Sequence, residues 1–177
     1  MSQIHENQAS SLPFTAGYKR YSKRHCNHCG TLIFLLLILI FMLSNHFSYA
    51  INVSESLSQK FWLIHLNAKP KRNDYILFRS PPNIGLEADA TIIKQVAGIP
   101  GDEVLRRGRN FFINEEYIAT AKSHSLAGDP LEPGFEGILK KGQYYVHSPH
   151  PDSFDSRYAA FGLVDSMQHL GVAYPLW

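Results

Sequence analysis

Cysteine is scarce in this sequence of 177 residues, which contains two, Cys26 and Cys29, both placed before the most apolar segment of the chain. The part that follows this segment therefore has to fold without a disulfide bond. With His25 and His28 beside them, the two cysteines could form half of a zinc site or a redox pair, but no second pair of ligands lies nearby. We expect no metal and no other cofactor.

An excess of charge of one sign is also lacking. The formal net charge is +2 at pH 7, and the sequence contains no arginine-rich block and no alternation of basic and aromatic residues. Proteins that bind nucleic acid cluster their basic residues on one face or along one segment. Nucleic acid is therefore excluded as an expected partner.

Charged residues are absent from residues 30–51, at whose centre lies the uninterrupted apolar run 32–43. At 12 residues the run alone is shorter than the roughly 17 to 25 residues of a spanning helix, but the charge-free segment reaches that length. We therefore predict a transmembrane anchor at 30–51. A buried core helix is one alternative, and a cleavable signal peptide is another, with Ser48 and Ala50 resembling a cleavage site. The tail of about 30 residues before the run is long for a signal peptide.

Basic residues flank the predicted anchor on its amino-terminal side. No Lys or Arg follows it until Lys60, whereas four precede it closely: Lys19, Arg20, Lys23 and Arg24. The positive-inside rule predicts that residues 1–29 form a cytoplasmic tail. Residues 52–177 would then fold on the opposite side of the membrane.

Long amphipathic helical patterns and internal repeats are absent beyond residue 51. Short runs of strand-forming residues are separated there by turn sequences such as Pro-Pro-Asn, Pro-Gly-Asp and Gly-Arg-Asn. The predicted strands are 74–80, 91–99, 103–107, 111–114, 117–121, 143–148 and 169–177. This pattern predicts a mainly β domain built from antiparallel strands.

Lys94 occupies an unusual position in the predicted strand 91–99. Successive side chains of a strand point to opposite faces, so Lys94 shares a face with the branched residues Ile92 and Val96. One interpretation is an edge strand whose lysine reaches water and blocks aggregation. The other is a lysine removed from water, whose lowered pKa leaves a neutral amine that can act as general base for a serine.

Three blocks of the sequence carry a resemblance to a known family: NVSESL at 52–57, IIKQVAGIPGD at 92–102 and SFDSRYAAFG at 153–162. In order and spacing they resemble the serine, lysine and carboxy-terminal boxes of the type I signal peptidases, the S26 family of serine-lysine endopeptidases. The middle block is the most specific of the three. The resemblance implies a membrane-bound enzyme with the antiparallel β fold of a signal peptidase.

The first two blocks imply the catalytic residues. Ser56, which directly precedes Leu57, matches the nucleophile of the family. Ser54 matches the residue whose hydroxyl helps to form the oxyanion hole, together with the backbone N–H of the nucleophile. Lys94 matches the general base, in agreement with the second interpretation of its place in the strand.

The third block implies residues that support the lysine. Ser153 matches the serine that holds the lysine amine in place, and Asp155 and Arg157 match a supporting ion pair. Three blocks therefore imply six site residues and no metal.

Departures from the family pattern point to one branch of it. Ser58 stands where the family usually has a proline, one or two places after the Met or Leu. Gln95 replaces the common arginine after the lysine, and HSPHPD at 147–152 replaces the Gly-Asp-Asn that often precedes the third block. The small size and Leu57 resemble the TraF-like peptidases of conjugative transfer, which process pilin precursors. The resemblance implies an exported precursor, a pilin in that branch, as partner, and a single-pass protein of the bacterial inner membrane with a periplasmic domain at 52–177.

Other functions remain open. His147, His150 and Asp152 could bind zinc, although two prolines favour a loop that frames the third block. A histidine-based triad lacks a Gly-x-Ser-x-Gly elbow. Self-cleaving repressors share the serine-lysine chemistry but are soluble and carry a DNA-binding module. The non-enzymatic alternative is an inactive, membrane-anchored subunit of a transfer or secretion apparatus.

Overall fold

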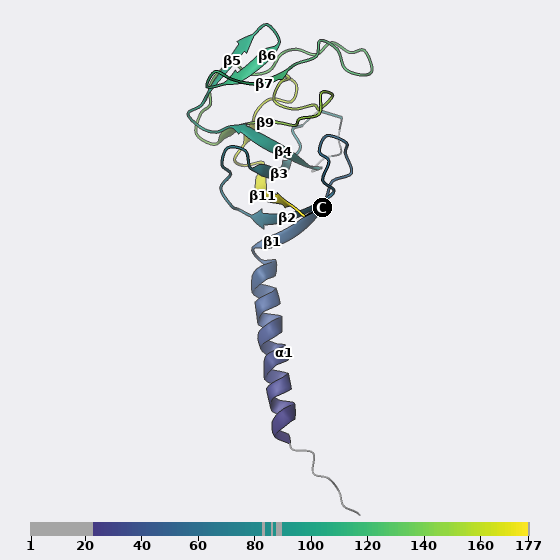
Figure 1. Cartoon of the computed structure of the whole chain (residues 1–177), viewed down its shortest axis with the longest axis vertical. Helices are drawn as coiled ribbons and strands as arrows, with labels where there is room; N and C mark the ends of the chain where they lie inside the picture. The colour runs from purple at the N-terminus through teal and green to yellow at the C-terminus, as the bar shows by residue number, and fades with distance from the viewer. Residues whose placement is uncertain (1–22, 83, 86, 88–89, 177) are drawn as a thin grey trace, which may run out of the picture. The chain divides into compact units, whose positions relative to one another are not determined.

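The computed structural model describes residues 23–82, 84–85, 87 and 90–176, with the side chains described from residue 29 onward. Of the predicted tail 1–29, residues 1–22 lie outside the described residues, and Lys19 and Arg20 are among them. The chain divides into two units, residues 1–39 and 40–177. Figure 1 shows the helix and the strands that the described residues form.

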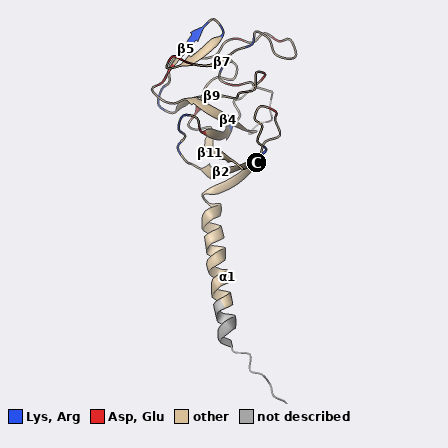
Figure 2. Cartoon of the chain, in the orientation of Figure 1, with Lys and Arg blue, Asp and Glu red and all other residues tan. Residues whose placement is uncertain are grey.

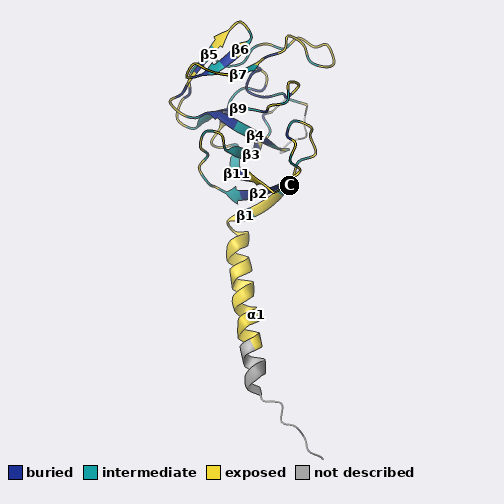
Figure 3. Cartoon of the chain, viewed as in Figure 1, coloured by how far each residue is buried: buried dark blue, intermediate teal, exposed yellow. Residues whose placement is uncertain are grey.

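The first element is the helix α1 (Lys23–Ser44). The side chains from Leu32 to Leu43 are exposed to between 40% and 67% (Figure 3). The interpretation of the apolar run as a buried core helix is therefore wrong. Within the described residues, no helix combines the length and apolar character that are needed to span a membrane.

The helix ends earlier than the predicted anchor 30–51. Ser44 Oγ and Asn45 Nδ2 donate hydrogen bonds of 2.8 and 3.0 Å to the Phe41 carbonyl oxygen, which lies in the last turn of the helix. The strand β1 (Phe47–Ile51) begins three residues after the last helical residue. The prediction was wrong for this end of the segment, because residues 47–51 pair their backbone with a neighbouring strand and do not continue the helix.

The larger of two sheets has seven strands in the order β1-β2-β11-β3-β4-β9-β10, and all neighbours are antiparallel. Besides β1, its members are β2 (Phe61–Leu66), β3 (Tyr75–Arg79), β4 (Thr91–Gly98), β9 (Gln143–His147), β10 (Val164–Asp165) and β11 (His169–Pro175). The smaller sheet has the order β7-β6-β5-β8, formed by β5 (Glu103–Arg107), β6 (Asn110–Ile113), β7 (Glu116–Thr120) and β8 (Gly137–Ile138). The prediction of a mainly β, antiparallel domain is confirmed.

Strand β4 lies in the interior of the larger sheet, between β3 and β9. Val96 packs in one apolar cluster with Phe78 and Val146, and the partly buried Ile92 packs against the same cluster. Ile93 belongs to a different cluster, around Trp62. The alternation of faces predicted for this strand is therefore correct, and the edge-strand interpretation of Lys94 is wrong because both sides of β4 are paired.

Candidate functional site

The first block forms a loop between β1 and β2, which we name the serine loop and define as residues 52–60. Its ends are joined by a hydrogen bond of 2.8 Å from the Asn52 N–H to the Lys60 carbonyl oxygen. Leu57 fixes the middle of the loop, since its side chain is buried in the cluster around Trp62. Ser54 is exposed and Ser56 is half-buried, and their Oγ atoms lie 2.9 Å apart.

Lys94 is buried within β4, with 4% of its surface exposed. Its Nζ donates a hydrogen bond of 2.6 Å to Ser153 Oγ. Burial lowers the pKa of Lys94 from its usual 10.5 to about 8; the Asp155 carboxylate raises it and the Arg157 guanidinium lowers it. The amine is thus held by one hydroxyl in surroundings that favour its neutral form.

The third block is held in place by a buried ion pair. Arg157 donates from Nε to Asp155 Oδ1 at 2.7 Å and from Nη2 to Oδ2 at 2.8 Å, and both residues are at most 2% exposed. The same Nη2 donates to the Ser153 carbonyl oxygen at 2.8 Å. The Asp155 carboxylate also accepts from the Ser148 N–H at 3.1 Å. These contacts fix the backbone that carries the Ser153 hydroxyl.

A second segment packs closely against this block. The Gly134 N–H donates a hydrogen bond of 2.7 Å to the Arg157 carbonyl oxygen. A Cβ atom on Gly134 would lie 2.3 Å from the Ser156 carbonyl oxygen, closer than van der Waals contact allows. Only glycine therefore fits at position 134 without a shift of the backbone.

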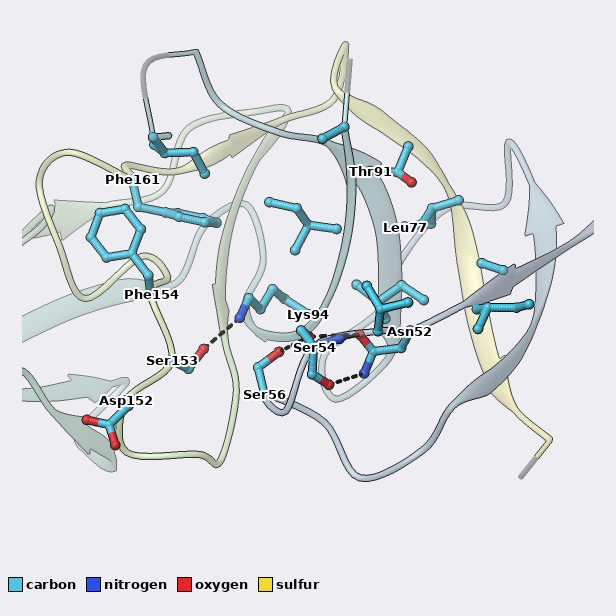
Figure 4. Close-up of a pocket in the computed structure, with 17 residues that line it drawn as sticks. Asn52, Ser54, Ser56, Leu77, Thr91, Lys94, Asp152, Ser153, Phe154 and Phe161 are labelled. Carbon is cyan, nitrogen blue, oxygen red and sulfur yellow. Dashed lines mark hydrogen bonds between the residues drawn. The ribbon is translucent and has the colours of Figure 1, made fainter. Parts of the chain in front are cut away.

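The serine loop, β4 and the third block meet at a cleft of about 480 Å³. Ser54, Ser56, Lys94 and Ser153 all line it, and Figure 4 shows the lysine amine directed toward Ser153. The structure thus brings these four site residues to one cavity, while Asp155 and Arg157 stabilise the backbone behind Ser153. Among the described residues Ser56 Oγ bonds to Ser54, and Lys94 Nζ bonds to Ser153.

Apolar side chains form most of the remaining wall of the cleft. They come from β1, the serine loop, β3, the segment before β4, β4 itself and the third block: Ala50, Ile51, Val53, Leu77, Ile84, Ala90, Ile92, Ile93, Phe154 and Phe161. A cleft with an apolar wall and a few convergent polar groups is typical of a ligand-binding site.

The alternative zinc ligands do not converge. No group of three or more His, Cys, Asp or Glu side chains that could hold a metal ion occurs in the described part of the chain. Asp152 forms an ion pair with Lys122, and His150 Nδ1 accepts a hydrogen bond from the Asp152 N–H at 3.2 Å. The Cys29 thiol is free and exposed, and the side chain of Cys26 lies outside the description.

Sequence reasoning missed one residue of the site, Asn52. Its carboxamide contacts Ser54 and two further residues of the serine loop. The signal was present at the start of the first block, because asparagine often bonds to nearby backbone groups at the entry to a turn.

Known proteins resemble this chain in sequence along most of its length. The family described as signal peptidase, peptidase S26, matches residues 23–177. The conjugal transfer protein TraF of Agrobacterium fabrum is 25% identical over 146 residues, which cover 73% of this chain and 82% of that protein. A crystal structure of a signal peptidase I from Enterococcus faecalis is 25% identical, covers 59% of this chain and 97% of its own, and has a TM-score of 0.40. Since the family match extends from the start of α1 to the last residue, this chain belongs to the signal peptidase family S26, as its three sequence blocks indicated.

Proposed function

We propose that this S26 peptidase is a serine-lysine endopeptidase that cleaves exported precursor proteins. The observation that carries the proposal is the buried amine of Lys94, which is bonded to Ser153 in a cleft that Ser56 also lines. A lysine with a pKa of about 8 is partly neutral near pH 7 and can accept a proton from a serine hydroxyl.

The proposed reaction follows the general course of acyl transfer. Ser56 Oγ attacks the carbonyl carbon of the scissile bond as its proton passes to Lys94 Nζ. The resulting oxyanion is stabilised by the Ser56 N–H and the Ser54 hydroxyl, and the proton then passes from Lys94 to the leaving amine. A water molecule then attacks the carbonyl carbon of the acyl-enzyme as Lys94 accepts its proton. Lys94 returns this proton to Ser56 Oγ as the ester bond breaks and the product carboxylic acid leaves. Ser153 holds the amine during these steps.

We further propose that the substrate is a pilin precursor in a conjugative transfer system. The sequence similarity to a conjugal transfer protein supports this assignment, as do Leu57 and the absence of Gly-Asp-Asn before the third block. The apolar wall of the cleft is suited to small or apolar side chains beside the scissile bond.

We propose, on the basis of the sequence, that α1 anchors the chain in the inner membrane with its catalytic domain in the periplasm. The 12-residue apolar run and the basic flank before it support this topology. An apolar face of the larger sheet supports contact with lipid. It consists of exposed residues of three neighbouring strands and of the residue that directly follows β11, and we name it the β1–β2–β11 face: Tyr49, Ile51, Phe61, Tyr174 and Leu176.

The β1–β2–β11 face lies on the side of these strands opposite the buried Trp62, Ile64 and Ala173. Ile51 pairs with Phe61, and Tyr49 and Tyr174 both pair with Leu63, so the exposed side chains are cross-strand neighbours. The three strands contain no Lys, Arg, Asp or Glu (Figure 2). Apolar and aromatic residues without charge suit the membrane interface.

The test of the proposed function replaces Ser56 and Lys94 separately by alanine in a bacterium that carries the whole transfer system. We expect either change to reduce processing of one exported protein by at least about 1000-fold, so that its precursor accumulates and mass spectrometry identifies it. Ser58→Ala and Lys60→Ala are the controls, because both residues are exposed. An inactive subunit predicts instead that all four variants process exported proteins like the parent chain.

A further inference from the structure

The carboxamide of Asn52 has one orientation that satisfies its surroundings. Nδ2 lies 3.1, 3.2 and 3.3 Å from the carbonyl oxygens of Ser54, Leu57 and Gln59. Oδ1 lies 3.1 Å from the Ser54 backbone nitrogen, which is a donor. Exchanging the two atoms would place an acceptor against three acceptors and a donor against a donor. The position of Oδ1 is therefore fixed by the backbone of the serine loop.

This orientation determines where the hydroxyl protons of the two serines point. Oδ1 of an amide can only accept hydrogen bonds, and Ser54 Oγ lies 2.8 Å from it. Ser54 must therefore donate its single hydroxyl proton to Asn52. The contact of 2.9 Å between the two serine oxygens then has one possible direction, with Ser56 as donor and Ser54 as acceptor.

We propose that Asn52 is a positioning residue of the peptidase site, which orients the Ser54 hydroxyl and, through it, the Ser56 nucleophile. This inference rests on the proposed function. The chain of hydrogen bonds from Ser56 to Ser54 to Asn52 holds both hydroxyls at the cleft before substrate binds. Preorganised donors of this kind need little rearrangement during reaction.

The hydrogen bonds from Ser56 to Ser54 and from Ser54 to Asn52 also give Asn52 a role when substrate enters the cleft. Ser54 donates to Asn52 Oδ1 until the carbonyl oxygen of the scissile bond takes over as acceptor. Oδ1 retains the bond from the Ser54 N–H after this exchange, so the loop keeps its backbone conformation. Ser56, released from Ser54, turns its proton toward Lys94. No bond other than these hydrogen bonds changes in this step.

A double-mutant cycle tests the inference with the purified full-length chain and the precursor that accumulates in the Ser56→Ala strain. We expect Asn52→Ala to lower kcat by about 10-fold and to change KM by less than about 3-fold. Because Asn52 acts through the Ser54 hydroxyl, the same change in a Ser54→Ala background should lower kcat by less than about 3-fold. Ser58→Ala serves as the control within the loop and should leave both constants unchanged.

Each outcome of the cycle has one meaning. An equal loss of kcat in the two backgrounds, or an unchanged kcat in Asn52→Ala, overturns the positioning role while the peptidase assignment stands. A loss of kcat in Asn52→Ala that appears only when Ser54 retains its hydroxyl supports the positioning role of Asn52. If the parent chain cleaves no precursor, or Ser56→Ala cleaves as well as the parent, the proposed function is overturned, and this inference with it.

Discussion

The pKa of Lys94 is influenced by two opposite charges, which both come from the third block. The Asp155 carboxylate stabilises the protonated amine and the Arg157 guanidinium destabilises it, while the two groups neutralise each other in a buried ion pair. Burial is the largest cause of the lowered pKa. Because the pair is bonded to the backbone of Ser153 and Ser148, it restrains the surroundings of the amine without fixing a net charge beside it.

The pKa of Lys94 predicts the pH dependence of activity. The amine must be neutral to accept a proton, and it is mostly protonated at a pH below its pKa of about 8. The value of kcat/KM should therefore rise with pH and level off above about pH 8. A group with this pKa is about one-tenth neutral at pH 7 and about nine-tenths neutral at pH 9, which gives about a tenfold rise in kcat/KM. The measurement is a pH–rate profile of the full-length chain.

His147 provides the control for this profile. It lies in β9, opposite Gln95 on the neighbouring strand, and burial lowers its pKa below the usual 6.5, so it is neutral across the range of interest. His147→Gln should therefore retain the midpoint near pH 8. A midpoint near 6.5, or a midpoint lost in this variant, would contradict the assignment of the base to Lys94.

How far individual residues could be predicted depended on the range of their contacts. The face of β4 that Lys94 shares with Ile92 and Val96 followed from the two-residue period of a strand, which is a local property of the sequence, but the burial of Lys94 was only one of two interpretations. The contact between Lys94 and Ser153 joins residues 59 positions apart, and only the family resemblance had paired them. Asn52 was missed although its partners lie only two to seven positions along the chain, because the family resemblance marked the serines of the first block and not the residue that begins it.

Among the elements, the seven predicted strands all occur, but β1, β2, β8 and β10 were not predicted. The residues of β1 had been assigned to the anchor because they carry no charge. The sequence of β2, FWLIHL, is apolar almost throughout and lacks the alternation that marks a half-buried strand. β8 and β10 have two residues each, too few to form a pattern. Two of these unpredicted strands, β1 and β2, are the ones that hold the serine loop.

The segment that includes Gly134 predicts a specific effect on stability. Gly134→Ala places a methyl group where the Ser156 carbonyl oxygen now lies, so the third block or its neighbour has to move. We expect a loss of about 1 to 3 kcal/mol in the free energy of unfolding, measured by thermal or chemical denaturation. Cleavage should also fall, because Ser153 lies in the displaced block.

Gly30 is the matched control for this substitution. It lies in α1, and apart from the backbone of its own helix and its two chain neighbours an added Cβ would have no heavy atom within 4 Å. Gly30→Ala should leave the stability of the β domain unchanged. A Gly134→Ala chain as stable as the parent would show that the packing of this segment is not required.

At the scale of the whole molecule, the distribution of cysteine allows the proposed topology to be tested. The β domain contains no cysteine, and Met167 is 86% exposed there. With Cys26 and Cys29 changed to serine, a Met167→Cys chain should react with a membrane-impermeant maleimide in intact spheroplasts. The parent chain should react only after lysis, because its two cysteines lie on the cytoplasmic flank of the proposed anchor. The reverse pattern would exclude a periplasmic domain.

The short connection between α1 and the serine loop sets a limit on where this protein can cut. Ser56 follows the last helical residue, Ser44, by 12 positions. A fully extended chain advances at most about 3.6 Å per residue, so Ser56 Oγ cannot be further than roughly 45 Å from the end of the helix. If the helix is fixed in a bilayer, this connection limits the distance from the end of the helix at which the protein can cleave. A scissile bond that is held further than this distance from the end of the helix stays uncut, even when the side chains beside it fit the cleft.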